Sequence, residues 1–228
     1  MARLFAAADS ITIPQDFSTG GVVSFRMRTT QTTTNAELVS HHSPTASVQG
    51  YGVTINNGAF TPGKLCVTGK SGAAIAFNIA SVTNVNDGNW HHIGINLWYS
   101  GLANGNQLFV DGALEAQADA GGFWGGATDP FRLGKSNDTF WAGYVGELAE
   151  VAVWAGGGTS LRFTPEQFAA LAKGYAPDAV WRGGSAGALH IYMPLDRTVQ
   201  CKLSEQGTPT VSGTSVTDHP PAIGSSGP

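Results

Sequence analysis

Hydrophobic and polar residues alternate with a period of two along most of this chain, as they do in half-buried β-strands. Within 21–28, Val23, Phe25 and Met27 fall on one face of a predicted strand and the polar residues between them fall on the other. Clusters of Gly, Asn, Asp and Pro separate such segments, so the pattern predicts an all-β fold, an antiparallel β-sandwich. The same alternation recurs at Ile11/Ile13, Tyr51/Val53/Ile55, Leu65/Val67, Ile75/Phe77/Ile79, Ile93/Ile95/Leu97/Tyr99 and Leu189/Ile191/Met193.

A tight hairpin is predicted at Asp111-Gly112, which lies between the apolar segments 108–110 and 113–114. Asp followed by Gly tolerates the positive φ angles that a two-residue type I′ turn requires. The sequence therefore joins these two strands directly.

One helix is predicted, over residues 164–173. Thr164 can cap its first turn and Gln167 completes a Thr-x-x-Gln capping box, while Gly174 can end the helix in a left-handed conformation. Phe168 begins a short apolar stripe. A helix this short persists only when it packs on other structure, so we expect it to cover an edge or an end of the sandwich.

The chain has 228 residues, enough for one all-β domain with a sizeable core. We expect the sandwich to span 1–207 and the Ser/Gly/Pro-rich segment 208–228 to form a C-terminal arm. The first apolar run stops at Asp9, too early for a signal peptide, which predicts synthesis in the cytoplasm. No apolar stretch is long enough to predict a membrane-spanning segment.

The charge of the chain limits the classes of partner that it is expected to bind. Charged residues make up 12% of the chain, the net charge is -4, and Lys and Arg form no cluster. Nucleic acids and anionic membranes both attract a basic surface, so neither is expected as a partner. Sparse charge also favours a surface covered by neighbouring proteins.

Paired carboxylates are the first place to look for catalysis. Retaining glycoside hydrolysis needs two carboxyl groups about 5–5.5 Å apart on one face. Glu147 and Glu150 are three positions apart in a predicted strand, so regular alternation sends them to opposite faces. We therefore predict that the protein is not an enzyme and that it has no catalytic residues.

The histidine pairs and the cysteines give no metal site. In strands, the neighbours His91-His92 and His41-His42 point to opposite faces and cannot hold one ion together. Cys66 and Cys201 lack the spacing of a zinc site, and we expect two separate reduced thiols. No cofactor is predicted.

The loops hold the candidate binding or interface residues. Phe123-Trp124 stands between two Gly-Gly pairs and predicts either a stacking surface or a plug for the core. Asn137 and Asp138 lie in a polar loop beside Trp141. Calcium is an alternative at this loop, although it takes six to eight oxygen ligands and few acids stand nearby.

The segment 89–154 resembles the laminin G-like branch of the concanavalin A-like β-sandwiches. The resemblance rests on Trp90-His91-His92-Ile93, Leu108-Phe109-Val110-Asp111-Gly112, Phe131-Arg132-Leu133-Gly134 and the run from Tyr144 to Trp154. It implies a jelly-roll sandwich in which the Trp-His pair packs. Calcium near the rim of the sheets is also known in this branch. Most relatives bind or assemble, and some branches do chemistry.

A narrower resemblance, to a variant seen in tailed-phage virion proteins, rests on the helix, Gly-Tyr-Ala-Pro at 174–177, the segment 190–196 and the tail 213–221. The family usually has Trp or Tyr where this chain has Met193. The resemblance implies a non-catalytic virion component, such as a capsid decoration or head fibre, that contacts capsid proteins or copies of itself. The alternatives are a module that binds carbohydrate on a host or surface glycan and, third, a glycoside hydrolase.

Overall fold

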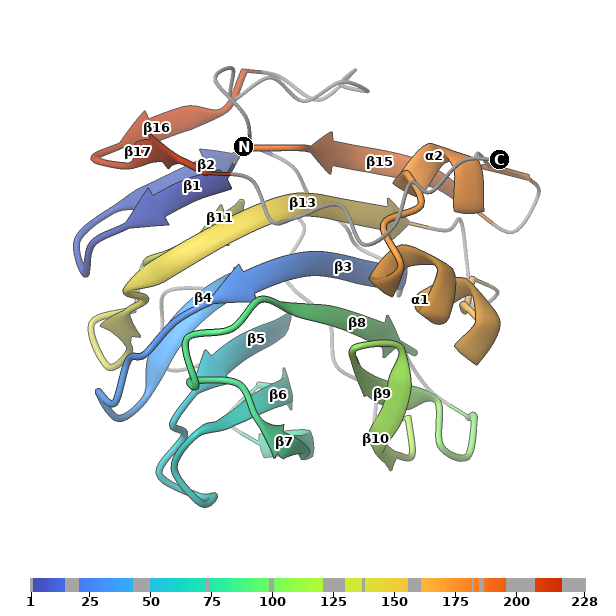
Figure 1. Ribbon diagram of the computed structural model, residues 1–228. Helices are drawn as coiled ribbons and strands as arrows, with labels where there is room; N and C mark the ends of the chain where they lie inside the picture. Colours follow the sequence, from blue (N-terminus) through green and yellow to red (C-terminus); the bar gives the residue numbers. More distant parts are fainter. Residues whose placement is uncertain are drawn as a thin grey trace.

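Two β-sheets packed face to face form the framework of the protein (Figure 1). A computed structural model describes residues 2–14, 21–42, 50–72, 74–98, 101–120, 130–136, 138–155, 161–181, 183–184, 187–195 and 208–218. Within them the strand pairs are antiparallel except for β12 with β4. The predicted sandwich is confirmed.

The first sheet runs in the order β10-β9-β8-β3-β13-β1-β17, with β15 also on β13 and β14 on β15. Its strands are β1 (Ala2–Phe5), β3 (Gly21–Arg28), β8 (His91–Leu97), β9 (Asn106–Val110), β10 (Ala113–Ala118), β13 (Gly146–Ala155), β14 (Gly183–Gly184), β15 (Gly187–Met193) and β17 (Ser215–Thr217).

The second sheet runs in the order β16-β2-β11-β4-β5-β6-β7, with β12 also on β4. Its strands are β2 (Ser10–Ile13), β4 (Ala36–His42), β5 (Gly50–Ile55), β6 (Lys64–Ser71), β7 (Ala74–Asn84), β11 (Phe131–Leu133), β12 (Ala142–Gly143) and β16 (Thr210–Ser212).

The core between the sheets is built from the alternating apolar positions that the sequence predicts. All of them that the structure describes are buried there except two. Ile75 is 59% exposed, because a register shift beside Gly69 turns it outward. A second shift, in the pairing of β13 with β15, places Leu189 opposite Trp154 in a separate apolar cluster. Tyr99 lies outside the described residues.

Helices α1 (Pro165–Ala172) and α2 (Pro177–Val180) lie on the outer face of the first sheet (Figure 1). Phe168 of α1 packs on Phe109, with ring centroids 4.3 Å apart, and its ring fills the space above Gly94. A Cβ at Gly94 would stand 2.2 Å from that ring. The helix therefore packs on the outer face of a sheet, where the sequence predicted an edge or an end of the sandwich, and the Phe168 ring forms the main contact.

The predicted turn chemistry is confirmed. Asp111 and Gly112 have φ of 51° and 83°, as a type I′ turn requires. Helix α1 carries the complete capping box between Thr164 and Gln167, and Gly174 follows with φ of 94°. Helix α2 was not predicted. In the part of the chain that the structure describes, neither helix has the length and apolar character to cross a bilayer.

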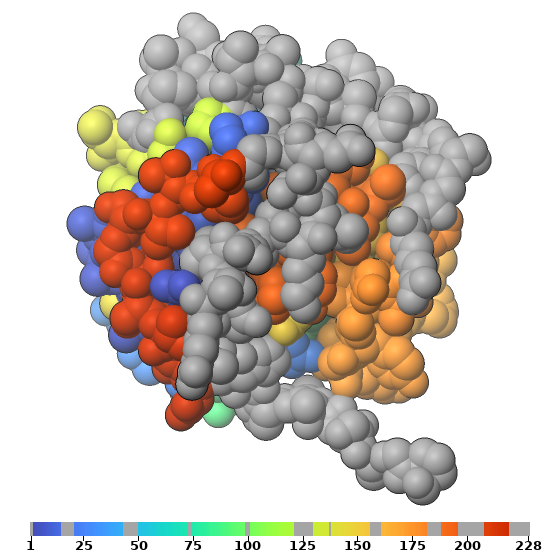
Figure 2. Space-filling model, turned by 90° about the horizontal axis from the view of Figure 1, so that it is seen from above, coloured from blue at the N-terminus to red at the C-terminus, as the bar shows by residue number. Residues whose placement is uncertain are grey.

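Part of the segment expected to form an arm pairs with the sandwich. Strand β16 pairs with β2 in the second sheet and β17 pairs with β1 in the first, so 210–217 extends both sheets. Seen from above, these strands lie beside the N-terminal strands, on the side away from the helices (Figure 2). Residues 219–228 lie outside the described part, and the boundary at 207 stays a prediction.

Candidate functional site

A slot opens on the outer face of the second sheet, and two glycines form its floor. Gly50 and Gly52 of β5 alternate with Tyr51 and Val53, which face the core. The slot encloses a volume of about 20 Å³, within about 280 Å³ of empty space that includes open solvent. The enclosed volume holds about one water molecule, so the slot admits one small polar group rather than a whole ligand.

One wall of the slot comes from β4. Nε2 of His42 and Oε1 of Glu37 are 2.9 Å apart, and both side chains are buried. Five positions separate these residues, an odd number that regular alternation would split between two faces. A bulge between Glu37 and Val39 adds one residue, so Leu38 and Val39 both enter the core while Glu37 shares the outer face with His42.

The second carboxylate oxygen of Glu37 is the unusual atom of the site. Oε2 is buried and has no hydrogen-bond partner among the described residues, and the residue is 1% exposed. A buried carboxylate oxygen without a donor costs free energy, and nearly all such atoms in proteins are bonded to protein, water or ligand. Oε2 is therefore an acceptor for a water molecule, or for one O–H or N–H group of a ligand that takes the place of that water.

The opposite wall comes from β6 and is built of neutral groups with one cation. Thr68 and Lys70 line it, and Thr54 of β5 closes the floor. The Thr68 hydroxyl donates to Oδ1 of Asn78 at 2.8 Å. Beside it, burial raises the pKa of Cys66 to about 11, so that residue remains a thiol. The slot thus offers one carboxylate oxygen, hydroxyls and one ammonium group.

Aromatic side chains stand at the end of the slot. Trp141 lines it and precedes Ala142, whose N–H donates to the carbonyl of Asn35 at 3.0 Å. The Phe140 and Trp141 rings meet edge to face, 4.9 Å apart and at 88°. Phe140 is 66% exposed. The slot is therefore flanked by an aromatic pair of which one member faces solvent.

Of the predicted site residues, the structure places Trp141 in the slot and Asp138 in the turn that leads to it. Asp138 Oδ1 accepts a hydrogen bond from the Phe140 N–H at 2.8 Å and so braces the aromatic turn. Phe123, Trp124 and Asn137 lie outside the described residues. In the described ranges, no group of three or more His, Cys, Asp or Glu side chains is placed to hold a metal ion.

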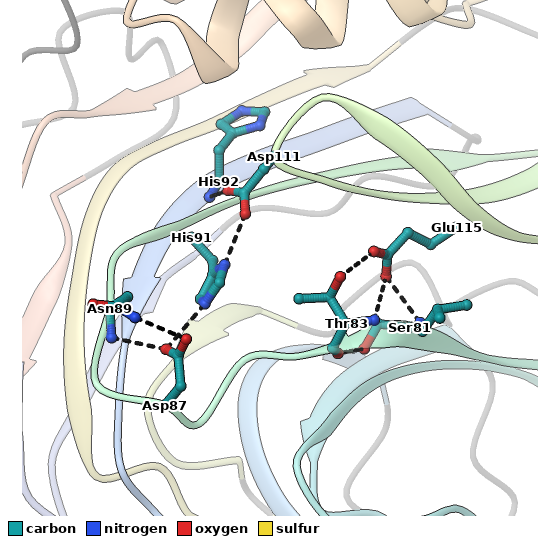
Figure 3. A network of polar contacts seen from close by, with 9 residues as sticks. Ser81, Thr83, Asp87, Asn89, His91, His92, Asp111 and Glu115 are labelled. Atoms are coloured by element: carbon teal, nitrogen blue, oxygen red, sulfur yellow. Dashed lines mark hydrogen bonds and ion pairs between the residues drawn. The ribbon is translucent and has the colours of Figure 1, made fainter.

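His91 and His92 point to opposite sides of β8, as predicted (Figure 3). Nδ1 of His91 lies 2.8 Å from Asp111 and Nε2 lies 3.1 Å from Asp87. A neutral imidazole has one N–H, so donation to both carboxylates requires the protonated ring. The hydrogen bond to Asp111, followed in size by the opposing effect of burial, leaves the pKa of His91 raised.

His92 turns toward helix α1 and is buried (Figure 3). Its Nε2 is 2.9 Å from the Ser24 hydroxyl. Burial, with the nearby positive charge of Arg26, lowers the pKa of His92 to about 3. The pKa values of the two neighbouring histidines are therefore shifted in opposite directions.

The predicted separation of Glu147 and Glu150 onto opposite faces is wrong. A bulge in β13 between Ala149 and Ala152 breaks the alternation, and Glu150 takes φ of 51°. Both carboxylates then meet partners on the outer, helix-bearing face. Glu147 accepts from the Arg28 guanidinium and Glu150 accepts from the Tyr192 hydroxyl at 2.6 Å.

These two carboxylates are engaged in separate contacts. Glu147 also accepts from the Thr217 hydroxyl at 2.7 Å. Burial acts to raise the pKa of Glu147, but hydrogen bonds from Arg28 and Thr217 outweigh it and leave the pKa lowered. A carboxylate held ionised is a poor general acid, so the geometry gives no support to hydrolysis by this pair.

Sequence reasoning missed Glu37, His42, Lys70 and Phe140. The Gly-x-Gly at 50–52 in an otherwise apolar strand was a usable signal, because glycine in a strand often marks close approach of another group. The bulge that turns Glu37 outward left no signal in the sequence. Trp141 was found because aromatic residues beside polar loops are typical of binding sites.

The family model described as the concanavalin A-like lectin/glucanases superfamily matches residues 5–157. This chain belongs to that superfamily. Its members share the sandwich seen here, and the match spans strands of both sheets, including β4, β5 and β6 that form the slot. No curated protein sequence matches the chain.

Solved structures with the same fold align with most of this chain. A putative carbohydrate-binding protein from Bacteroides ovatus matches with a TM-score of 0.66 and 16% identity over 98% of this chain and 62% of that one. The native heptameric SAP-like pentraxin from Limulus polyphemus gives 0.59 and 13%, over 96% and 94%. Domain 4 of AbnA, an extracellular arabinanase from Geobacillus stearothermophilus, in complex with arabinotriose, gives 0.55 and 16%, over 75% and 76%. At these identities the likeness establishes the fold.

Proposed function

We propose that this protein is a non-catalytic carbohydrate-binding domain and that the slot on the second sheet is its glycan site. The observation that carries the proposal is the buried Oε2 atom of Glu37, which lines the slot and has no partner among the described residues. Sugar hydroxyls are donors that such an oxygen accepts, and Trp141 supplies an apolar surface for a sugar face. Similar folds that include a putative carbohydrate-binding protein and an arabinotriose complex support the proposal.

The composition of the slot favours binding over hydrolysis. Cleavage of a glycosidic bond takes a pair of carboxyl groups in most glycosidases. Glu37 is the one acidic residue among the described residues that line the slot. Glu37 can accept a hydrogen bond from a sugar hydroxyl. Cleavage would also need a second acid to protonate the leaving oxygen, and the described residues that line the slot include none.

Native gel electrophoresis tests the proposal. The measured quantity is how far arabinan, xylan, β-glucan, mannan or bacterial cell-wall polysaccharide in the gel retards the purified protein. We expect at least one polysaccharide to retard the parent protein and the variant Glu37→Ala to lose about ten- to a hundredfold in affinity, as a charged buried hydrogen bond of ~1.5–3 kcal/mol implies. Glu166→Gln, an exposed acid on α1, is the matched control and should bind as the parent does. Failure of every polysaccharide to bind, or unchanged binding by Glu37→Ala, would refute the proposal.

A second proposal is that the domain is carried on a virion as an outer structural component, contacting capsid protein or copies of itself. The observation that favours it is that each C-terminal strand leaves one apolar side chain partly exposed, Val211 of β16 at 40% and Val216 of β17 at 43%. Only 12% of the residues are charged, which suits a surface covered in an assembly. Immunogold electron microscopy of particles from the producing host tests it, and unlabelled particles would overturn it.

A further inference from the structure

Two Asn-Gly pairs, at 57–58 and 104–105, differ in how the fold holds their side chains. We infer that Asn104 is a site of spontaneous deamidation and that Asn57 is protected from the same reaction. Asn-Gly is the sequence in which this chemistry is fastest, because glycine has no side chain to hinder attack by its backbone nitrogen. The Asn104 pair lies between β8 and β9 of the first sheet, whereas the slot lies on the second sheet.

The reaction uses the backbone of the protein and water. The Gly105 nitrogen, after giving its proton to a base in the solvent, attacks Cγ of Asn104 and forms a new C–N bond. The bond from Cγ to Nδ2 breaks, and Nδ2 takes up a proton and leaves as ammonia. Water then adds to either carbonyl of the cyclic succinimide, which opens to aspartate or isoaspartate.

The side chain of Asn104 is exposed, and no hydrogen bond to a described residue holds its amide. The bonds that the residue makes among the described residues use its backbone. Its N–H donates to Oδ1 of Asp119 at 2.9 Å, and its carbonyl accepts from the Arg162 guanidinium at 3.2 Å. The Gly105 N–H donates to the Leu102 carbonyl at 3.2 Å, the long end of the normal range. That one bond must open before the nitrogen can attack.

Asn57 is held at the atoms that the reaction uses. Its leaving group, Nδ2, donates to the Thr54 hydroxyl at 3.3 Å, and its Oδ1 accepts from the Ala59 N–H at 3.0 Å. The nucleophile, the Gly58 nitrogen, donates its proton to Oδ1 of Asn35 at 2.9 Å. Asn57 is also 9% exposed, which limits the access of base and water. The two pairs therefore share a sequence but not an environment.

Deamidation alters the contact between this turn and the segment that precedes α1. A carboxylate at position 104 stands near Asp119, a like charge, and isoaspartate adds a methylene group to the backbone. Both changes displace the Asn104 carbonyl that Arg162 binds. Arg162 also donates to Oε1 of Gln107 at 3.1 Å, so we expect the contact to weaken without being lost.

The experiment incubates the folded parent protein in a mildly alkaline buffer and follows both sites by peptide mapping with mass spectrometry. Each deamidation adds one mass unit. We expect Asn104 to react about five- to a hundredfold faster than Asn57, as the two hydrogen bonds of the Asn57 amide imply. In urea the two rates should be similar, because the unfolded chain holds neither amide. Asn104→Gln is the control, because glutamine forms the larger ring slowly, and it should remove the faster signal.

Asn35→Gly tests the protection of the second site. Glycine accepts the φ of 58° at this position and removes the oxygen that holds the Gly58 N–H. We expect Asn57 to react about two- to tenfold faster in this variant and Asn104 to keep its rate. Equal rates at the two sites of the folded parent, or an Asn104 that stays intact while the unfolded chain reacts at both sites, would overturn the inference. So would an unchanged rate at Asn57 in Asn35→Gly.

Discussion

The carboxylate of Glu37 occupies the space that Gly52 leaves empty. Its Oε1 atom lies 2.2 Å from the point where a Cβ on residue 52 would stand. The glycine therefore determines where the carboxylate rests, beside His42 and above the floor of the slot.

Gly52→Ala is expected to weaken binding strongly without unfolding the protein. The added methyl group meets the tip of a flexible side chain, so Glu37 can rotate away at small cost to the fold, but its unpartnered oxygen then leaves the slot. Gel retardation should show a loss similar to that of Glu37→Ala, with a melting temperature close to that of the parent. Gly58→Ala is the control, because a Cβ there meets its nearest neighbours at 3.7 Å. Parent-like binding by Gly52→Ala would show that the position of the carboxylate is unimportant.

The strands and the helix could be read from the sequence because alternation and capping are local signals. The core positions Val23, Phe25 and Met27 and the cap at Thr164 all lie where the pattern places them. Alternation misleads at bulges, where one extra residue exchanges the two faces of a strand. That is why the faces of Glu37 and Glu150 could not be predicted.

Glu115 connects the free edges of the two sheets. Its carboxylate on β10 accepts from the N–H groups of Val82 and Thr83 on β7, at 2.9 and 3.0 Å, and from the Thr83 hydroxyl (Figure 3). We expect Glu115→Ala to lower the free energy of unfolding by about 1–2 kcal/mol, because water replaces only part of these bonds. Urea denaturation measures the change. Gln117→Ala, at an exposed position of the same strand, removes one long hydrogen bond, from the Gln107 side chain at 3.3 Å, and should cost less. Equal costs would show that the link is not specific.

Stability should peak near pH 6.5, because the neighbouring histidines titrate in opposite directions. The pKa of His91 is raised, and the largest cause is its hydrogen bond to Asp111. This shift stabilises the fold fully at pH values below the pKa of the unfolded state, about 6.5. The stabilisation is lost as pH rises through the pKa of the folded state. The pKa of His92, lowered to about 3 mainly by burial, makes stability fall as pH drops from about 6.5 toward 3. Urea unfolding from pH 4 to 9 at constant ionic strength measures the profile.

Single substitutions separate the two limbs of that profile. His91→Gln should flatten the fall above about pH 6.5 and keep the acid limb, since His92 is unchanged. His92→Asn should flatten much of the acid limb down to about pH 4, below which carboxylates such as Asp87 and Asp111 protonate. Burial acts to raise the pKa of each carboxylate, yet their hydrogen bonds leave both lowered. A profile in which both variants keep both limbs would contradict the assignment.

The Arg26 side chain, on β3, links the first sheet to the end of helix α1. Its guanidinium donates to the carbonyls of Leu171 and Ala172, at 3.1 and 2.9 Å, in the last turn of the helix, where carbonyls lack the partner four residues on. The Leu171 carbonyl also accepts from the Gly174 N–H at 2.9 Å. Arg26→Met keeps the aliphatic stem but removes the donors, so we expect a loss of about 1.5–3 kcal/mol in urea unfolding.

The same variant has a second, electrostatic readout. The charge of Arg26 helps to lower the pKa of His92, after burial, so Arg26→Met should raise that pKa and make the acid limb of the stability profile shallower. Lys173→Met removes an exposed positive charge at the end of the same helix and should change neither the stability nor the acid limb appreciably. A stability loss with an unchanged acid limb would mean that Arg26 acts on the helix alone. An unchanged stability would mean that the aromatic contacts of Phe168 hold α1 without it.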